Sequence, residues 1–267
     1  MKILFFDIDG TLIDSAHFHF DIPEAVMKEL RRIQAQGHKL FIASGRPAPL
    51  ITPEIKAGNF DGYVLNNGGC VFADGKSIYE ERMGRELVRD VTKVLLDIGC
   101  EYLLDTADKA YMRRDFKDIE RNFAEAGVEA AFTRDYVEED IMDEVVKMEC
   151  LPADRDASAA EAALNERIGD RYRSDVNGAL GSFEIYAPAL SKATGCRKVL
   201  EYYGAALEDS YAFGDGVNDI DMLQAVGTSV AMGNAAEEVR EAADIVCPPI
   251  SEDGLATILR ELFPDQA

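Results

Sequence analysis

The most constraining feature of this chain is the order in which short apolar runs alternate with amphipathic segments. Residues 2–6, 39–43 and 63–65 are short apolar runs that each end at polar or glycine-rich residues. Between the first two runs, Pro23 opens a segment whose apolar residues recur at helical spacing until Gly37. Strand, helix and strand in this order predict a parallel sheet with right-handed crossovers.

This rhythm is interrupted in the middle of the chain and resumes after Pro188. The interrupting segment predicts an α+β unit with helices over residues 84–98, 116–126 and 158–168 and strands over 101–105, 145–150 and 182–186. After it, the sequence predicts strands over 210–213, 229–232 and 244–246 with helices between them. We therefore expect an α/β fold in which residues 1–80 and 187–267 form one sheet domain and residues 81–186 are inserted into it.

The charge balance excludes several classes of partner. The chain has 28 basic and 50 acidic residues, a formal net charge of -22. Such a field opposes contact with nucleic-acid phosphates and with anionic membranes, so neither is expected as a partner, and it favours a soluble monomer. It also repels a phosphorylated metabolite, so a phosphate site must be locally positive. Metal ions, a buried lysine or helix N-termini can supply that charge.

The cell compartment is predicted from several absences in the sequence. No apolar run reaches the ~18 residues that span a bilayer, and Asp7 interrupts the first apolar run too early for a signal-peptide core. The five cysteines are odd in number and widely spaced, and no pair is separated by two residues. This pattern favours reduced thiols over zinc or disulfides. We expect a cytoplasmic protein.

Carboxylates follow two of the predicted strands. Asp7 and Asp9 come directly after the first strand, where open parallel sheets bind ligands. One carboxylate can attack phosphorus and the other can transfer protons, although Asp is also common in turns. Asp215 and Asp219 follow a later strand and can ligate Mg²⁺ together with Asp7 if the strands are adjacent. For Asp219, charge compensation at a helix N-terminus is an alternative.

Other side chains at these strand ends suit phosphate. Gly10 and Thr11 predict a turn whose backbone N–H groups bind an anion. The Ser44 hydroxyl can donate to a phosphate oxygen, or can serve a turn or a cap. Lys192 stands in the first turn of a predicted helix, where the helix dipole disfavours a cation. Lys192 would have a reason to stand there if it neutralised both the phosphate and the nucleophile. The alternative is that its side chain is merely solvated.

Taken in order, these segments resemble the four motifs of the haloacid dehalogenase-like hydrolases. The matching residues are Asp7-Ile8-Asp9-Gly10-Thr11-Leu12, Ser44-Gly45-Arg46, Lys192 and Gly214-Asp215-Gly216-Val217-Asn218-Asp219. Asn67-Gly68, the place of the insertion between the second and third motifs, and Ala231-Met232-Gly233-Asn234-Ala235 are similar to the Cof-type phosphatase branch. Ala193 stands where many relatives have glycine after the motif lysine.

The resemblance implies a fold and a set of roles. It implies a Rossmann-like core with an α+β cap, an Asp7 nucleophile that becomes phosphorylated, and Asp9 as general acid and base. Phosphate binding is implied for Gly10, Thr11, Ser44, Gly45, Lys192 and Asn218. A Mg²⁺ cofactor is implied at Asp7, the Asp9 carbonyl and Asp215, with Asp219 in support. The expected activity is a phosphatase of small phosphate esters, foremost sugar phosphates.

The cap is expected to set substrate specificity, because the core residues contact only the phosphoryl group. The candidate contacts are Arg46, Asp105, Arg113, Arg114 and Glu184. His17 and His19 resemble a metal-binding pair, but their alternation also suits a hairpin strand. Two other functions stay open. A phosphomutase shares the nucleophile and acid/base pair, and a signalling module also phosphorylates an aspartate beside Mg²⁺ ligands.

Overall fold

The computed structural model describes residues 1–125, 128–178 and 180–265. By internal contacts the chain divides into two units. The first comprises Met1–Gly45, Ile51–Tyr79 and Ser191–Ala267, and the second comprises Arg46–Leu50 and Glu80–Leu190. The expected boundaries fell after residues 80 and 186, and the segment Arg46–Leu50, which groups with the second unit, was expected in the first.

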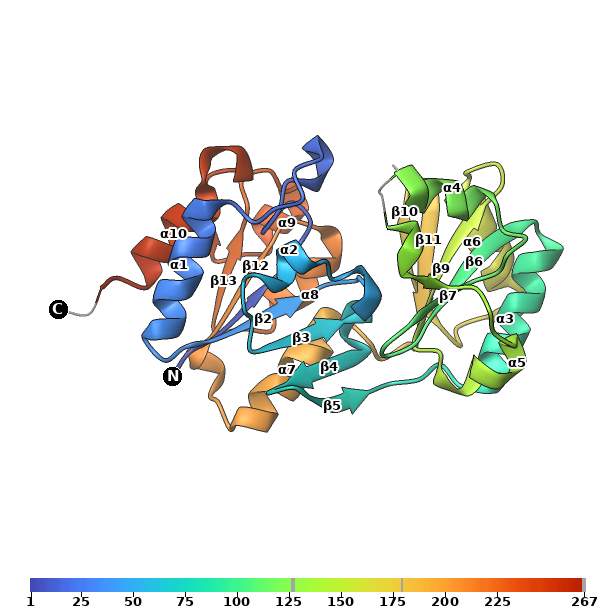
Figure 1. The fold of residues 1–267 in the computed structure, drawn as a ribbon, viewed down its shortest axis with the longest axis horizontal. Coiled ribbons are helices and arrows are strands. Elements are labelled where there is room, and N and C mark those ends of the chain that lie inside the picture. The colour runs from blue at the N-terminus through green and yellow to red at the C-terminus, as the bar shows by residue number, and fades with distance from the viewer. Residues whose placement is uncertain (126–127, 179, 266–267) are drawn as a thin grey trace. The chain divides into compact units, whose positions relative to one another are not determined.

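An eight-stranded sheet organises the first unit (Figure 1). In spatial order its strands are β14 (Ile245–Val246), β13 (Thr228–Ala231), β12 (Ser210–Gly214), β1 (Ile3–Phe6), β2 (Lys39–Ala43), β3 (Gly62–Leu65), β4 (Cys70–Ala73) and β5 (Lys76–Glu80). Neighbours from β14 to β3 are parallel, and β4 turns back antiparallel to β3. The α/β fold class with a Rossmann-like parallel sheet is thus confirmed.

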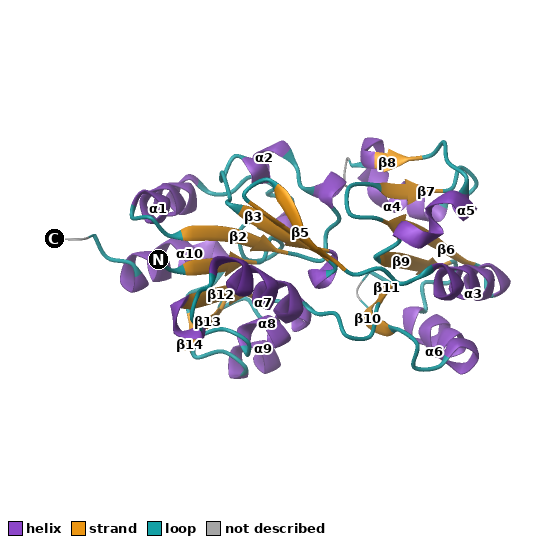
Figure 2. Cartoon of the chain, turned by 90° about the horizontal axis from the view of Figure 1, so that it is seen from below, coloured by secondary structure: helices purple, strands orange, loops and turns teal. Residues whose placement is uncertain are grey.

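Helices cover both faces of this sheet (Figure 2). They are α1 (Glu24–Ala35), α2 (Pro53–Lys56), α7 (Lys192–Tyr203), α8 (Ile220–Leu223), α9 (Glu237–Glu241) and α10 (Gly254–Leu262). Because side chains alternate along a strand, Phe5 and Phe41 face α7, where they share a buried cluster with Cys196 and Val199. The fully buried strand β1 needs apolar side chains on both faces, which explains its unbroken apolar run.

Strand register brings the functional segments to one edge of the sheet. Phe6, the last residue of β1, lies opposite Ile42 of β2 and Phe213 of β12. The chain therefore leaves β1, β2 and β12 at the same level, although β12 follows β1 by about two hundred residues. The candidate site lies in the segments that follow these three strands.

The second unit contains a six-stranded sheet. Its strands in spatial order are β10 (Arg173–Asn177), β11 (Ser182–Tyr186), β9 (Lys147–Pro152), β6 (Cys100–Asp105), β7 (Ala110–Met112) and β8 (Phe132–Thr133). Its helices are α3 (Arg85–Asp97), α4 (Asp118–Glu125), α5 (Glu138–Ile141) and α6 (Ala157–Ile168). Helices α3 and α6 pack on one face of the sheet, over a core that includes Leu104, Met148 and Phe183.

The sequence predicted the longer elements of this unit and missed the shorter ones. Helices α3, α4 and α6 match the predicted segments, except that Ala126, the last residue predicted for α4, lies outside the described residues. Strands β7, β8 and β10 were not predicted, because three short or polar runs give no clear period of two. Among the described residues, no helix is long and apolar enough to cross a membrane.

Candidate active site

The turn after β1 holds the first pair of carboxylates. The Asp7 backbone N–H donates to the Phe213 carbonyl at 2.9 Å, which continues the pairing of β1 with β12. The chain then folds back, with the Leu12 N–H donating to the Ile8 carbonyl at 2.9 Å. Gly10 sits in this turn at φ +81°, and a Cβ there would lie 2.0 Å from an oxygen of Asp215. The turn therefore requires glycine for its backbone angle and for space.

Lys192 connects this turn to the segment after β12. Its side chain is buried, and Nζ donates to Asp7 Oδ1 at 2.5 Å and to Asp219 Oδ1 at 2.7 Å. Lys192 is the first residue of α7. The start of this helix lies close to Gly68, because a Cβ on Gly68 would be 2.1 Å from the Ser191 carbonyl oxygen. The two carboxylates thus explain why a lysine is stable at a helix N-terminus.

Asp219 and Asp215 complete a cluster of carboxylates. Asp219 is fully buried, and its Oδ2 accepts hydrogen bonds from the backbone N–H groups of Asp215, at 3.0 Å, and Gly216, at 2.9 Å. Thr11 Oγ1 donates to Asp215 Oδ1 at 3.0 Å. One oxygen each of Asp7, Asp215 and Asp219 lies within 4.8 Å of the others.

The electrostatics of this cluster fit a bound cation. Burial raises the pKa of Asp7 well above its usual range; Lys192 opposes the shift, and the neighbouring carboxylates add to it. Burial and then Asp219 raise the pKa of Asp215 to about 7. Three carboxylates around one ammonium carry more negative charge than Lys192 offsets. Oxygen donors in this arrangement suit Mg²⁺, which prefers carboxylates, waters and phosphate oxygens.

The remaining predicted phosphate residues lie at the same edge of the sheet. Ser44 is buried directly after β2, where its N–H donates to the Val64 carbonyl at 2.8 Å and its carbonyl accepts from the Asn67 N–H at 3.2 Å. Gly45 follows it. Asn218, next to Asp219, approaches Asn67 with its amide nitrogen 3.5 Å from the side-chain oxygen.

The predicted specificity residues lie outside this cluster, in the second unit. Arg46 donates to the Leu50 carbonyl at 3.2 Å. Arg113 forms an ion pair with Asp115 at 3.0 Å. Arg114 pairs with Asp135, and Glu184 pairs with Lys147. In the first unit, exposed His17 contacts Asp14 at 2.9 Å.

Asn234 belongs to this site although it was not predicted there. Its side-chain nitrogen donates to the Gly10 carbonyl at 2.9 Å and lies 3.3 Å from Asp215 Oδ2, while its oxygen accepts from the Ile250 N–H at 2.9 Å. The available signal was its place shortly after β13, a parallel strand that ends at the same edge as β12.

Comparison with known proteins decides the family. A model of the haloacid dehalogenase-like hydrolases matches residues 4–259. The chain belongs to the haloacid dehalogenase-like hydrolases. This hydrolase is 33% identical over 265 residues to YkrA of Bacillus subtilis, covering 98% of this chain and 97% of that one. It is 28% identical over 273 residues to the 5-amino-6-(5-phospho-D-ribitylamino)uracil phosphatase YbjI of Escherichia coli, covering 100% and 98%.

Solved structures agree with this membership. A sugar phosphatase of subclass IIB of the superfamily superposes with a TM-score of 0.84 at 28% identity, over 98% of this chain and 99% of that one. The predictions of the family, its Cof-type branch and a phosphatase activity are confirmed. This hydrolase therefore acts on phosphate esters.

Proposed function

We propose that this hydrolase is a Mg²⁺-dependent phosphatase of small phosphorylated metabolites, foremost sugar phosphates, that forms an aspartyl phosphate at Asp7. The observation that carries the proposal is the buried Lys192 shared by Asp7 and Asp219, with Asp215 completing a trio of carboxylates. The sugar phosphatase among the structural neighbours supports the substrate class. Residues 1–80 and 187–267 would then be the catalytic core, and residues 81–186 the specificity cap.

The reaction needs two proton transfers and two nucleophiles, first Asp7 and then a water. A carboxylate oxygen of Asp7 attacks phosphorus, the bond to the ester oxygen breaks, and Asp9 protonates the leaving oxygen. Asp9, now ionised, then takes a proton from a water whose oxygen attacks phosphorus. That step releases phosphate and regenerates Asp7. Asp9 stands two residues after Asp7 and is half-buried.

Charge neutralisation is the main requirement of phosphoryl transfer, because an anionic nucleophile approaches an anionic group. Lys192 holds Asp7 and faces the phosphoryl group, and Gly10, Thr11, Ser44, Gly45 and Asn218 would bind its oxygens. Asp7, Asp215 and the Asp9 carbonyl would hold Mg²⁺, with Asp219 in support through Lys192 or a water. When bound, Mg²⁺ supplies a positive charge that stabilises the developing negative charge on the phosphoryl oxygens.

The test is phosphate release from a panel of sugar, nucleotide and cofactor phosphates, with Mg²⁺ and with chelator. We expect Mg²⁺-dependent release from a subset and none from Asp7→Asn. The matched control is Asp21→Asn, which removes the same charge from an exposed aspartate of the same segment. Acid-quenched Asp9→Asn should retain phosphate on Asp7 by mass spectrometry. Near-normal turnover by Asp7→Asn would refute the assignment of Asp7 as the nucleophile. Transfer of the phosphoryl group to a second hydroxyl of the substrate would indicate a phosphomutase.

A further inference from the structure

The turn after β3 has an unusual backbone. Asn66 and Asn67 have φ +51° and Gly68 has φ +94°, so three consecutive residues lie at positive φ. Residues other than glycine adopt this region rarely and at a cost in free energy, although asparagine tolerates it better than most. Both asparagines are buried. Strain of this kind persists where the surrounding structure fixes it, and it is concentrated at functional sites, so the turn is a candidate for a functional role.

Asn67 connects this turn to two of the segments that build the site. Its backbone N–H donates to the Ser44 carbonyl at 3.2 Å. Its side-chain oxygen accepts from the amide nitrogen of Asn218 at 3.5 Å, the long end of the hydrogen-bond range. The neighbouring Asn66 differs, because its amide nitrogen lies 3.6 Å from Cys70 Sγ, at the start of β4. Asn67 therefore reaches out of the turn to the segments after β2 and β12, whereas this contact of Asn66 stays within the hairpin of β3 and β4.

The same turn supports the start of α7. A Cβ on Gly68 would lie 2.1 Å from the Ser191 carbonyl oxygen, and a Cβ on Gly195 would lie 3.1 Å from Gly68 Cα. The backbone of the turn thus packs directly on the first turn of α7. Lys192 follows Ser191, so the place from which its side chain reaches Asp7 depends on this contact.

The turn therefore contacts three segments that are far apart in the sequence. Each supplies one side chain to the proposed phosphate site: Ser44 after β2, Lys192 at the start of α7 and Asn218 after β12. Lys192 is held by two carboxylates. Among the described residues, by contrast, Asn67 is the hydrogen-bond partner of the Asn218 side chain. Binding side chains need such support, because small departures from the productive geometry weaken binding.

We propose that Asn67 is a positioning residue of the phosphate site, whose side chain orients the Asn218 amide towards a phosphoryl oxygen. An amide nitrogen has two N–H donors, so one can donate to Asn67 while the other donates to the phosphoryl group. Asparagine combines the two properties that this position needs, tolerance of positive φ and a neutral acceptor oxygen. The inference rests on the proposed function, which assigns phosphate binding to Asn218, and adds a residue to that site.

Asn67→Gly tests the side chain alone. Glycine keeps the backbone N–H and adopts positive φ readily, so the variant should fold as the wild type does. Loss of the acceptor should lower kcat/KM for a phosphate ester about tenfold, and should weaken inhibition by inorganic phosphate by a similar factor. The Mg²⁺ concentration for half-maximal activity should not change, because Asn67 orients a phosphate ligand and not a metal ligand. An unchanged kcat/KM would overturn the inference.

The matched control is Asn59→Gly. Asn59 is an exposed asparagine of the same unit with φ +53°, so both variants replace an asparagine at positive φ by glycine. Asn59→Gly should keep the wild-type kcat/KM and the wild-type inhibition by phosphate. If both variants lose activity equally, the loss is a general effect of added backbone freedom, and the inference is overturned.

A double-mutant cycle shows whether Asn67 acts through Asn218. Asn218→Ala removes the amide that Asn67 is proposed to orient, and the variant Asn67→Gly/Asn218→Ala removes both side chains. We expect the double variant to have the same kcat/KM as Asn218→Ala, because no amide is left to orient. If the two losses multiply instead, Asn67 acts independently of Asn218 and the inference is wrong.

Binding of inorganic phosphate separates failure of this inference from failure of the proposed function. In the presence of Mg²⁺, thermal unfolding in increasing phosphate measures binding without turnover. Weaker stabilisation of Asn67→Gly than of Asn59→Gly would support the inference even if the wild type released no phosphate from any ester, a result that would refute the proposed function. Turnover by the wild type together with equal stabilisation of both variants would overturn the inference and leave the proposed function intact.

Discussion

At the scale of single residues, Lys192 and Asn234 show two ways of holding the same acidic cluster. Lys192 is buried and bonds two carboxylates that are separated by more than two hundred positions in the chain. Asn234 is exposed, and it joins the Gly10 carbonyl to Asp215 without adding charge. Lys192 therefore sets the charge of the site, whereas Asn234 orients a ligand that the proposed Mg²⁺ would contact.

Replacing Asn234 by alanine should weaken metal binding more than substrate binding. The variant loses the hydrogen bonds that orient Asp215 and the Gly10 carbonyl, and losing the partner of a metal ligand typically weakens affinity about 10- to 100-fold. The measurement is thermal unfolding as a function of Mg²⁺ concentration, alongside KM at saturating Mg²⁺. An unchanged Mg²⁺ dependence would show that Asn234 only anchors Ile250.

At the scale of elements, the turn after β1 depends on glycine in a way that the turn between β4 and β5 does not. Gly10 and Gly75 both have positive φ, +81° and +73°. A Cβ at Gly10 would meet the Asp215 carboxylate, whereas a Cβ at Gly75 would have nothing within 4 Å. The two positions thus share the backbone cost of a substitution and differ only in the contact with the site.

Gly10→Ala and Gly75→Ala should therefore separate stability from function. Both should lose about 1–2 kcal/mol of unfolding free energy, because alanine disfavours the left-handed region. Only Gly10→Ala should also lose at least about tenfold in Mg²⁺ affinity and in kcat/KM, since Asp215 must move. Urea unfolding and Mg²⁺ titration of both variants check this. Equal activity of the two variants would contradict a close approach of residue 10 to the Asp215 carboxylate.

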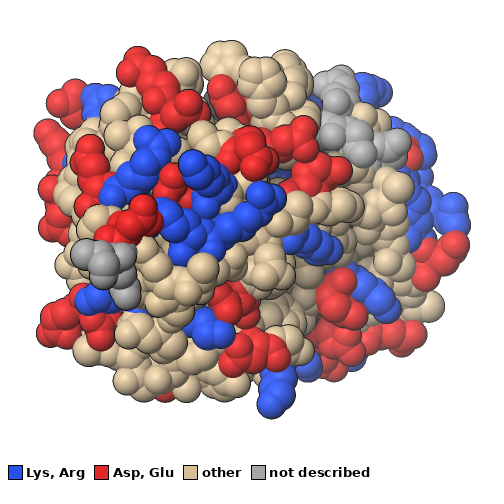
Figure 3. Space-filling model, turned by 60° about the vertical axis from the view of Figure 1, so that its left-hand side comes forward, with Lys and Arg blue, Asp and Glu red and all other residues tan. Residues whose placement is uncertain are grey.

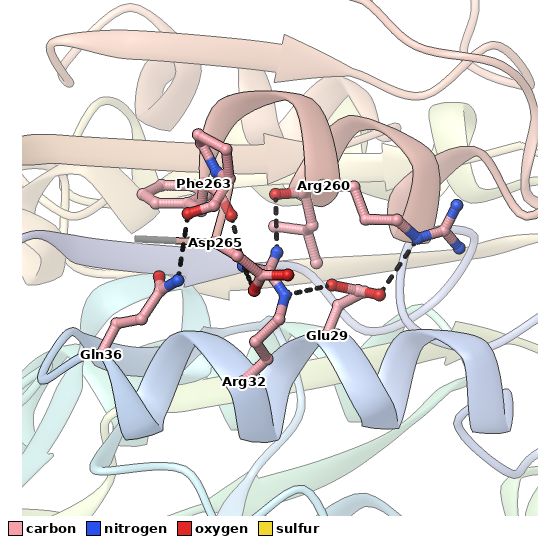
Figure 4. A network of polar contacts seen from close by, with 8 residues as sticks. Glu29, Arg32, Gln36, Arg260, Phe263 and Asp265 are labelled. Atoms are coloured by element: carbon pink, nitrogen blue, oxygen red, sulfur yellow. Dashed lines mark hydrogen bonds and ion pairs between the residues drawn. The ribbon is translucent and has the colours of Figure 1, made fainter. Parts of the chain in front are cut away.

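A second element-scale feature is the attachment of α10 to α1 (Figure 4). Buried Glu29 of α1 accepts from Arg32 at 2.7 Å and from Arg260 of α10 at 3.0 Å. Arg32 also donates to the Phe263 carbonyl, and Gln36 donates to the Pro264 carbonyl at 3.1 Å. Glu29 is thus the acceptor that two arginines share between the helices.

Glu29→Gln should lower the free energy of unfolding by about 1–2 kcal/mol at pH 7. The expected loss is kept small because Arg260 is half-exposed, so that solvent screens its ion pair with Glu29. Burial alone would raise the pKa of Glu29, but hydrogen bonds from Arg32 and Arg260 lower it overall. The stabilisation by ionised Glu29 is therefore fully present above the pKa of about 4.3 that the group has in the unfolded chain. It is lost as pH falls through the lower pKa that the group has in the folded protein. Urea unfolding at pH 7 and below pH 4 should show the difference shrinking. A constant difference would exclude the charge as its cause.

At the scale of the whole molecule, the net charge of -22 opposes the approach of an anionic ester. Figure 3 shows one face, on which Lys and Arg side chains lie among Asp and Glu side chains, so neither sign covers it alone. The phosphate site, whose positive charge would come from Lys192 and bound Mg²⁺, therefore lies in a repulsive field. Salt screens that field over a distance of about 10 Å at 0.1 M.

We expect kcat/KM for a phosphate ester to rise up to a few-fold between low and physiological ionic strength, at fixed free Mg²⁺. Stopped-time assays of phosphate release in increasing KCl measure this, with sucrose of equal osmolality as control. A fall in kcat/KM with KCl would mean that attraction by the site dominates over repulsion by the whole molecule.

The sequence by itself determined which segments would form the parallel sheet and where its polar strand ends would lie. Short apolar runs ended by Asp7, Ser44 and Asp215 carry that information locally, because burial and turn formation depend on neighbouring residues.

The same patterns do not encode which strands become neighbours. Only the tertiary structure placed β12 beside β1, gave Lys192 two carboxylate partners and brought Asn234 to Gly10. The physical reason is that pairing between distant strands is decided by packing of the whole chain, on which no local pattern depends.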